Sequence, residues 1–253
     1  MTLRERYRRR RADRARQRAC LRENAEFGRR GRLRYRRGVD LERVTAVVEG
    51  GGLTVVKAER QIIARSPDGW LVKRTSRRRA RRLWWNTCGL EVRGIPTPPL
   101  WARGRDWVVG EWAFGLPLDQ YVHGGYATLG RAGRNTFLRR LAELLRHMHE
   151  RGVFHHDLKG ENLVVTDGGV QVIDLDRVSF TLGVSRRRRI RNLAQINASV
   201  TPPVTRTDRL RLLRYYLGNE WSAVAERDWI ARIMRATVAR HHAWPVYGHR
   251  RSL

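Results

Sequence analysis

Two short stretches decide the fold of this chain: residues 155–162, HHDLKGEN, and residues 173–177, IDLDR. Within them, Asp157 lies five residues before Asn162 and 17 residues before Asp174. Short β-prone runs flank both stretches, so each is expected to sit beside a strand. Carboxylate and amide oxygens are the hard donors that Mg²⁺ prefers in proteins. The spacing therefore predicts a site with one catalytic carboxylate and two oxygen ligands for a metal.

The same pattern is that of a kinase catalytic loop followed by a metal-binding aspartate. Phosphoryl transfer needs a carboxylate that orients the acceptor hydroxyl, and oxygen ligands that hold Mg²⁺ across the phosphates of ATP. Asp157 is therefore predicted as the catalytic base, with Asn162 and Asp174 as metal ligands. Lys159 follows two residues after Asp157 and could neutralise charge on the transferred phosphate.

Lysine is rare in this chain, because all but three of its 53 basic residues are arginine. The remaining lysines are candidates for sites that need a compact ammonium group. Lys73 lies on the predicted strand 70–74, where a kinase-type fold places the lysine that clasps the α- and β-phosphates. Lys57 begins a glycine-free stretch where the phosphate-covering loop is expected. Basic side chains there would replace backbone amides over the phosphates.

The nucleotide base is expected at a hinge between two lobes. Glu111 and Trp112 follow the β-prone pair Val108-Val109 and resemble this interlobe hinge. Backbone groups of the hinge would bind the adenine edge of ATP, so its side chains could vary.

The periodicity predicts an α+β protein in two lobes, and its resemblance to the kinase catalytic loop implies a protein-kinase-like fold. Short β-prone runs, the first at 44–48, form an antiparallel meander with one inserted helix at 75–91. A mainly helical half follows, with Gly152 placed to end the helix 135–151. The predicted division is a basic N-terminal arm, an ATP-binding sheet lobe and a helical lobe with the catalytic loop and acceptor site: residues 1–43, 44–112 and 113–253.

Charge is the second strong signal, since 253 residues carry a formal net charge of +29. Residues 1–38 alone hold 16 arginines against four acids, which is typical of a frayed helix or disordered basic arm, of an appendage that touches an anionic surface, or of a misassigned start. Nucleic acid, an acidic membrane and a phosphorylated glycolipid all fit this charge. No helix-turn-helix, zinc-binding or RRM-type signature favours a specific nucleic-acid partner.

Two further features bear on the compartment. The two cysteines, Cys20 and Cys88, have neither metal-ligand spacing nor a disulfide framework, which is typical of a reducing cytoplasm. No run approaches 18 apolar residues, and the arginine-rich start lacks the apolar segment of a secretory signal.

Beyond the catalytic loop, the chain resembles the bacterial lipopolysaccharide core kinase family, whose members phosphorylate Kdo or heptose. Residues 94–98, GIPTP, and residues 173–177, IDLDR, are similar to family motifs, as are parts of the C-terminal helices. The resemblance spans about residues 44–240. It implies an ATP- and Mg²⁺-dependent kinase that acts on the lipopolysaccharide inner core, an anionic glycolipid, at the cytoplasmic face of the inner membrane. Peripheral contact with that membrane is expected.

A non-protein acceptor fits the short segment between Asp174 and the basic helix near Arg186, which leaves no room for a peptide-docking platform. The run 186–191 would suit an anionic glycolipid. One departure matters: Leu83 stands where the helical glutamate that pairs with Lys73 is expected, and Glu91 lies too late to replace it. The alternatives are a small-molecule kinase, an atypical protein kinase, and a pseudokinase that binds a partner without turnover. The sequence does not determine the oligomeric state.

Overall fold

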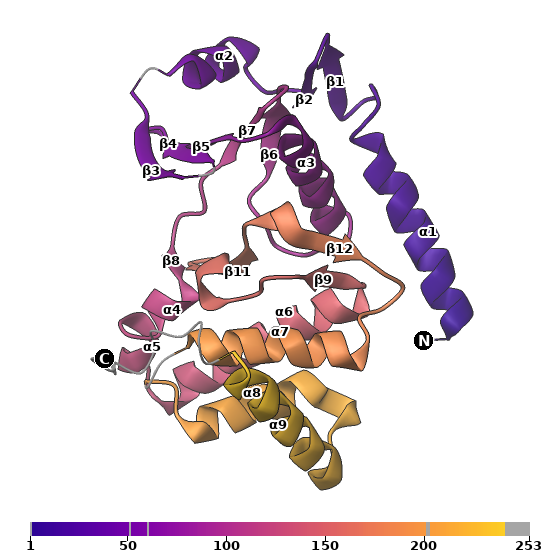
Figure 1. The fold of residues 1–253 in the computed structure, drawn as a ribbon, viewed down its shortest axis with the longest axis vertical. Helices are drawn as coiled ribbons and strands as arrows, with labels where there is room; N and C mark the ends of the chain where they lie inside the picture. Colours follow the sequence, from indigo (N-terminus) through magenta and orange to yellow (C-terminus); the bar gives the residue numbers. More distant parts are fainter. Residues whose placement is uncertain (1, 51, 60, 201–202, 241–253) are drawn as a thin grey trace. The chain divides into compact units, whose positions relative to one another are not determined.

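The computed structural model describes residues 2–50, 52–59, 61–200 and 203–240. The chain divides into two compact units. Helices and antiparallel strands are both present, which confirms the predicted mixture of helix and sheet. Unit 1 contains residues 1–114 and 173–176, and unit 2 contains residues 115–172 and 177–253 (Figure 1). The C-terminal end of the predicted helical lobe, residues 241–253, lies outside the described residues.

Unit 1 is built on a seven-stranded antiparallel sheet with the strand order β1-β2-β6-β7-β5-β4-β3. The predicted meander corresponds to β3, β4 and β5, with two more strands after the inserted helix and an N-terminal hairpin. The strands are β1 (Phe27–Arg30), β2 (Leu33–Arg36), β3 (Thr54–Ala58), β4 (Ile62–Arg65), β5 (Trp70–Arg74), β6 (Leu100–Arg103) and β7 (Trp107–Glu111).

The run 44–48, predicted as a strand, is instead part of helix α2 (Leu41–Glu49). Its β-branched residues favour a strand locally, but capping at both ends overrides that preference. The Asp40 side chain accepts hydrogen bonds from two backbone amides at the helix start, and Gly50 ends the helix with a φ of 108°. Val44 and Val47, three residues apart, then pack together in the core of the sheet.

The N-terminal segment, expected as a frayed or disordered arm, contains helix α1 (Leu3–Ala19), which lies along α3 (Figure 1). A capping box between Thr2 and Glu5 starts the helix. The Gln17 side-chain amide donates to the Trp85 carbonyl at 2.8 Å. The Trp84 indole N–H donates to the Cys20 carbonyl at 2.9 Å. These buried contacts give the arginine-rich helix a fixed inner face.

Helix α3 (Arg77–Glu91) is the predicted inserted helix, and the Ser76 side chain caps its start. It contacts β6 and β7 of the sheet. Leu83, Trp84 and Leu90 are fully or almost fully buried. The apolar side of the helix, at the expected spacing, therefore serves packing.

Unit 2 carries two small antiparallel sheets, β11-β10-β8 and β12-β9. Their strands are β8 (Leu116–Pro117), β9 (Val153–His155), β10 (Leu163–Thr166), β11 (Gly169–Val172) and β12 (Val178–Phe180). The short 3-10 turn η1 (Gly160–Asn162) lies between β9 and β10, and a second turn, η2 (Leu175–Arg177), follows β11 in the sequence, with Leu175 and Asp176 in unit 1. Both sheets therefore flank the stretches that the sequence singled out.

Helices make up the rest of unit 2, with α8 packed on α6 and α9 packed on α7. A further 3-10 turn, η3 (Gly218–Glu220), follows α8. The helices are α4 (Leu118–Tyr121), α5 (Gly125–Thr128), α6 (Arg131–Glu150), α7 (Arg186–Ser199), α8 (Arg206–Leu217) and α9 (Ala223–Val238). Within the described ranges, none of the helices has the length and apolar character needed to cross a membrane.

Candidate active site

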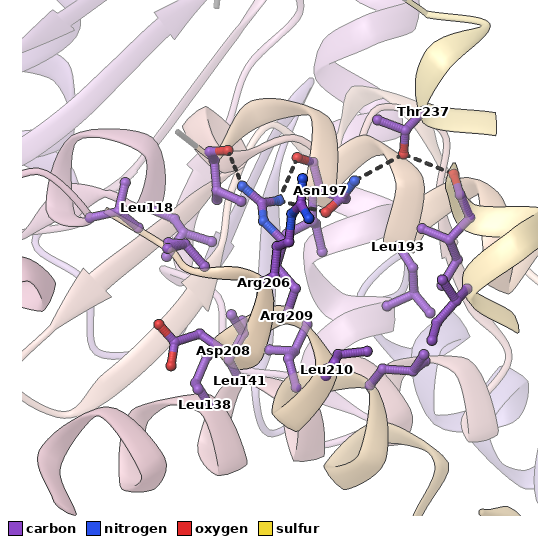
Figure 2. Close-up of a pocket in the computed structure, with 18 of the residues that line it drawn as sticks. Leu118, Leu138, Leu141, Leu193, Asn197, Arg206, Asp208, Arg209, Leu210 and Thr237 are labelled. Atoms are coloured by element: carbon purple, nitrogen blue, oxygen red, sulfur yellow. Dashed lines mark hydrogen bonds between the residues drawn. The ribbon is translucent and has the colours of Figure 1, made fainter. Parts of the chain in front are cut away.

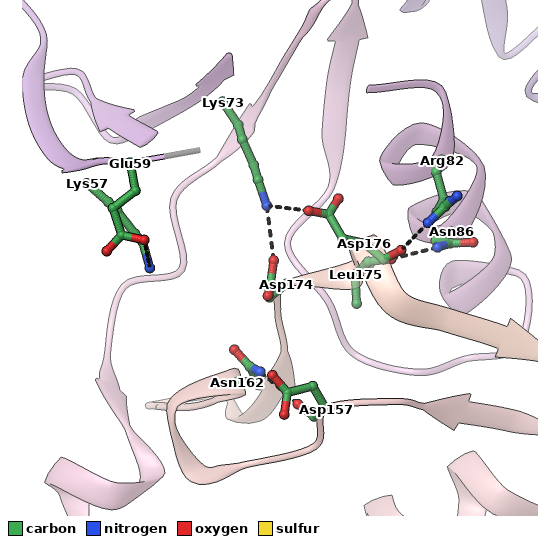
Figure 3. Close-up of polar contacts among 10 residues, drawn as sticks. All are labelled: Lys57, Glu59, Lys73, Arg82, Asn86, Asp157, Asn162, Asp174, Leu175 and Asp176. Atoms are coloured by element: carbon green, nitrogen blue, oxygen red, sulfur yellow. Dashed lines mark hydrogen bonds and ion pairs between the residues drawn. The ribbon is translucent and has the colours of Figure 1, made fainter. Parts of the chain in front are cut away.

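The loop after β9 is folded around Asp157. The Asp157 backbone N–H donates to Nδ1 of His155 at 3.1 Å, and the Asn162 side-chain amide donates to the Asp157 carbonyl at 2.8 Å. Figure 3 shows the Asn162 amide beside Asp157. The structure therefore brings the predicted base and one predicted metal ligand together in one loop of unit 2.

Helix α7 fixes this loop through polar side chains that are buried in unit 2. Asn192 donates to the His155 carbonyl at 2.6 Å. Gln195 donates to the His156 carbonyl at 2.9 Å and accepts from the Leu158 N–H at 3.2 Å. Because these groups are satisfied only in this arrangement, the loop is held in one conformation.

Lys159, predicted to reach the transferred phosphate, lies 2.8 Å from the Glu161 carboxylate. Its side chain is 39% exposed, so it is accessible from solvent. The role of Lys159 remains a prediction, and in this structure Glu161 competes for its ammonium group.

The second predicted metal ligand, Asp174, is paired with Lys73 in unit 1. Lys73 Nζ lies 3.0 Å from Oδ1 of Asp174 and 3.5 Å from Oδ2 of Asp176 (Figure 3). The Lys73 side chain is 6% exposed, so its charge is almost fully removed from water. A buried ammonium group requires such partners.

The two aspartates are positioned by an unusual turn. Asp174 has a φ of 54° and is the one non-glycine residue of the described chain with a positive φ. Aspartate tolerates this conformation better than most residues, and such backbones concentrate at functional sites. The next residue is fixed as well, since the Asn86 side chain of α3 donates to the Leu175 carbonyl at 2.6 Å (Figure 3).

Leu83 leaves open which carboxylate pairs with Lys73 in place of the helical glutamate, and in this structure that residue is Asp176. Leu83 is buried and supplies no carboxylate, and the Glu91 carboxylate binds Arg36 with contacts of 2.5 and 2.7 Å. Asp176 is instead the second carboxylate on Lys73. Burial raises the pKa of Asp176, while the nearby ammonium of Lys73 opposes this change. The sequence signal was an aspartate two residues after the predicted metal ligand Asp174, in a chain that lacks the helical glutamate.

The remaining predicted nucleotide contacts lie in unit 1. Lys57 is exposed on β3, with its ammonium 3.6 Å from the Glu59 carboxylate. The Glu111 N–H donates to the Pro99 carbonyl and the Trp112 N–H to the Gly69 carbonyl, each at 2.9 Å. The backbone amides of these two predicted adenine contacts already have partners, so an adenine would have to use other backbone groups nearby.

The two predicted metal ligands suit Mg²⁺ in their chemistry. The amide nitrogen of Asn162 donates to the Asp157 carbonyl, so the amide oxygen points away from that hydrogen bond. Asp174 is 41% exposed and offers a carboxylate. Both are hard oxygen donors. Within the described part of the chain, no group of three or more His, Cys, Asp and Glu side chains could hold a metal.

Unit 2 also contains an apolar pocket of about 620 Å³ lined by residues of helices α4 to α9, and Figure 2 shows many of its lining side chains. Leu118, Leu138 and Leu193 belong to its lining. Of the polar side chains there, Asn197 and Thr237 bind one another at 3.1 Å. None of the predicted catalytic or nucleotide-binding residues lines the pocket. The sequence did not reveal it, because apolar residues at helical spacing are expected to fill a core.

Comparison with solved structures defines the class of fold. A structure of WaaP in complex with acyl carrier protein superimposes with a TM-score of 0.60 and 23% sequence identity, covering 80% of this chain and 93% of that one. The chain thus has a kinase-like fold. The model of the lipopolysaccharide kinase (Kdo/WaaP) family matches residues 117–216. This confirms the predicted resemblance over the part that holds Asp157, Asn162 and Asp174, and it supports a kinase. No curated protein matches the chain.

Proposed function

We propose that this chain is an ATP-dependent kinase that phosphorylates a sugar hydroxyl, on Kdo or heptose, in the lipopolysaccharide inner core. The observation that carries the proposal is the loop around Asp157, which lies within the family match and is fixed by Asn162 and α7. The short segment between Asp174 and α7 also favours a small acceptor over a protein.

In this proposal each residue has one role. Asp157 accepts the proton of the acceptor hydroxyl, and Asn162 and Asp174 would hold Mg²⁺, which would neutralise charge on the phosphates of ATP. Lys73 would bind the α- and β-phosphates, and Lys57 would lie over them. Lys159 would contact the transferred phosphate. All three would stabilise negative charge that is present on the phosphates or develops during transfer. Backbone groups near Glu111 and Trp112 would bind adenine.

Loss of the gene should remove one phosphate from the lipopolysaccharide core. The core oligosaccharide would be isolated from parent cells, deletion cells and deletion cells that express either the wild-type chain or Asp157→Asn. Mass analysis should show one phosphate unit missing in the deletion strain, restored by the wild-type chain and not by the variant. An unchanged core in the deletion strain would contradict the proposed acceptor.

We also propose that α1 holds the protein at an anionic membrane surface, at the cytoplasmic side of the inner membrane. The buried residues Asp13 and Gln17 mark the inner face of α1. The opposite face carries arginines at the helical spacing, and no acid lies among them: Arg4, Arg8, Arg11 and Arg18, all exposed. Leu3 and Tyr7 are 74% and 60% exposed at the same end, as suits a helix at a lipid interface.

The triple variant Arg4→Gln/Arg8→Gln/Arg11→Gln should bind anionic vesicles at least tenfold more weakly, because each surface arginine contributes about 1 kcal/mol at such a membrane. Co-sedimentation with phosphatidylglycerol vesicles, and with phosphatidylcholine vesicles as the neutral comparison, measures this. A matched triple in the β1–β2 hairpin, which replaces the exposed Arg29, Arg30 and Arg32 with glutamine, removes the same charge. Equal losses in both triples would show that net charge, and not α1, governs binding.

A further inference from the structure

The basic run at the start of α7 separates into two sets by its partners. Arg186 pairs with Asp228 of α9, and Arg189 lies 3.7 Å from Glu220. These two arginines therefore hold the helices of unit 2 together. Three others are exposed and, across the described residues, have no carboxylate partner: Arg187, Arg188 and Arg191.

Two of these arginines, Arg188 and Arg191, lie near His156, and Arg177 joins them. Arg191 Nη2 is 3.5 Å from the His156 carbonyl oxygen. The Arg188 guanidinium lies 5.2 Å from the ring centre of Phe154, whose ring is 4.7 Å from that of His156. The exposed Arg177 accepts a hydrogen bond from the His156 N–H through its carbonyl, at 2.8 Å.

Arg177, Arg188 and Arg191 form a cluster beside His156, here called the arginine cluster. Their positive charges act on the His156 side chain. Burial lowers the pKa of His156, and the three guanidinium groups lower it further. The guanidinium groups of all three arginines therefore act on the same ring. Like charges gathered without an acid are stabilised when an anion binds between them.

We propose that the arginine cluster binds the acidic group, carboxylate or phosphate, of the acceptor sugar. Guanidinium groups match both anions with paired hydrogen bonds. Since His156 and Asp157 are consecutive, their Cα atoms lie about 3.8 Å apart, and an acid held at the cluster brings hydroxyls of the same sugar within reach of Asp157. The identity of the sugar rests on the proposed function, but the site itself does not require turnover.

Binding without nucleotide tests the cluster directly. Isothermal titration of the full chain would use three probes: Kdo, its methyl ester, which keeps the sugar and lacks the charge, and inorganic phosphate. The variant Arg188→Gln/Arg191→Gln should bind Kdo at least tenfold more weakly than the wild type. The control Arg227→Gln/Arg235→Gln removes two exposed charges from α9 and should stay within twofold.

The three probes distinguish binding of a carboxylate from binding of a phosphate group. Preference for Kdo over its ester assigns the site to a carboxylate, and cluster-dependent binding of phosphate assigns it to a phosphate group. Equal binding of acid and ester without phosphate binding, or equal losses in both double variants, would overturn the inference. A chain that binds Kdo at the cluster but transfers no phosphate would overturn the proposed function alone. Phosphate transfer with an unchanged acceptor KM in Arg188→Gln/Arg191→Gln would overturn the cluster alone.

Discussion

Asp157→Asn should lower the rate of phosphate transfer by about 10²–10⁴-fold, the usual contribution of a positioned general base. Asparagine has the same shape but cannot take up the proton of the acceptor hydroxyl. The loop should keep its fold, because the contacts that hold it use the Asp157 backbone: its N–H binds His155 and its carbonyl binds Asn162. The measurement is the initial rate of transfer from labelled ATP.

Two controls make this result specific. Binding of Mg²⁺-ATP to Asp157→Asn should stay within twofold of the wild type, since Asp157 is not assigned to the metal. Asp167→Asn changes an exposed aspartate in the β10–β11 turn of the same unit and should keep wild-type activity. Normal turnover in Asp157→Asn would remove the assignment of the base.

Lys73→Met should lower transfer by at least about 100-fold, the scale seen when one electrostatic contact to a reacting group is removed. It should also weaken ATP binding, because the buried ammonium is the predicted contact to the α- and β-phosphates. Melting temperatures are needed beside the rates, since removing one partner of a buried ion pair costs about 3–5 kcal/mol.

Asp176→Asn tests whether Asp176 positions Lys73 in place of the missing helical glutamate. We expect a loss of about tenfold in transfer, as one charged hydrogen bond is worth about 1.5 kcal/mol or more. The pH profile separates positioning from general destabilisation. Burial raises the pKa of Asp176, so protonation on lowering the pH begins earlier than for an ordinary aspartate and releases Lys73. In Asp176→Asn this acid-side loss of activity should disappear.

An exposed acid in the same unit provides the comparison for Asp176. Glu42→Gln on α2 removes one negative charge far from the pair in sequence and should leave both rate and pH profile unchanged. A wild-type profile in Asp176→Asn would show that Asp174 alone suffices for Lys73.

The sequence predicted those parts of the fold where local pattern and tertiary environment agree. The run 62–74 and the helix 75–91 carry strong strand and helix patterns, and both appear at nearly the predicted positions. Residues 44–48 were predicted wrongly as a strand. Their β-branched residues favour a strand, and the capping residues Asp40 and Gly50, which favour a helix, were given too little weight. The order of residues 3–19 was missed because a buried Gln17 can be recognised only with its partner, the Trp85 carbonyl.

For the site, spacing singled out Asp157 and Asn162, and the structure holds them in one loop, where the Asn162 amide donates to the Asp157 carbonyl. Their catalytic roles stay predictions. The partner of Lys73 could not be derived, because Lys73 and Asp176 are brought together over 103 residues by tertiary structure. The division of residues 186–191 into paired and unpaired arginines likewise depends on the packing of α7 against α9.

Transfer of labelled γ-phosphate by the purified full chain tests the central claim most directly. The chain would be incubated with ATP, Mg²⁺ and a panel of acceptors: lipopolysaccharide core, an aminoglycoside, choline and a generic protein substrate. We predict Mg²⁺-dependent label on a core sugar, absent in Asp157→Asn. Label on protein or on a small-molecule acceptor alone, or no transfer and no ATP hydrolysis at all, would contradict a lipopolysaccharide kinase.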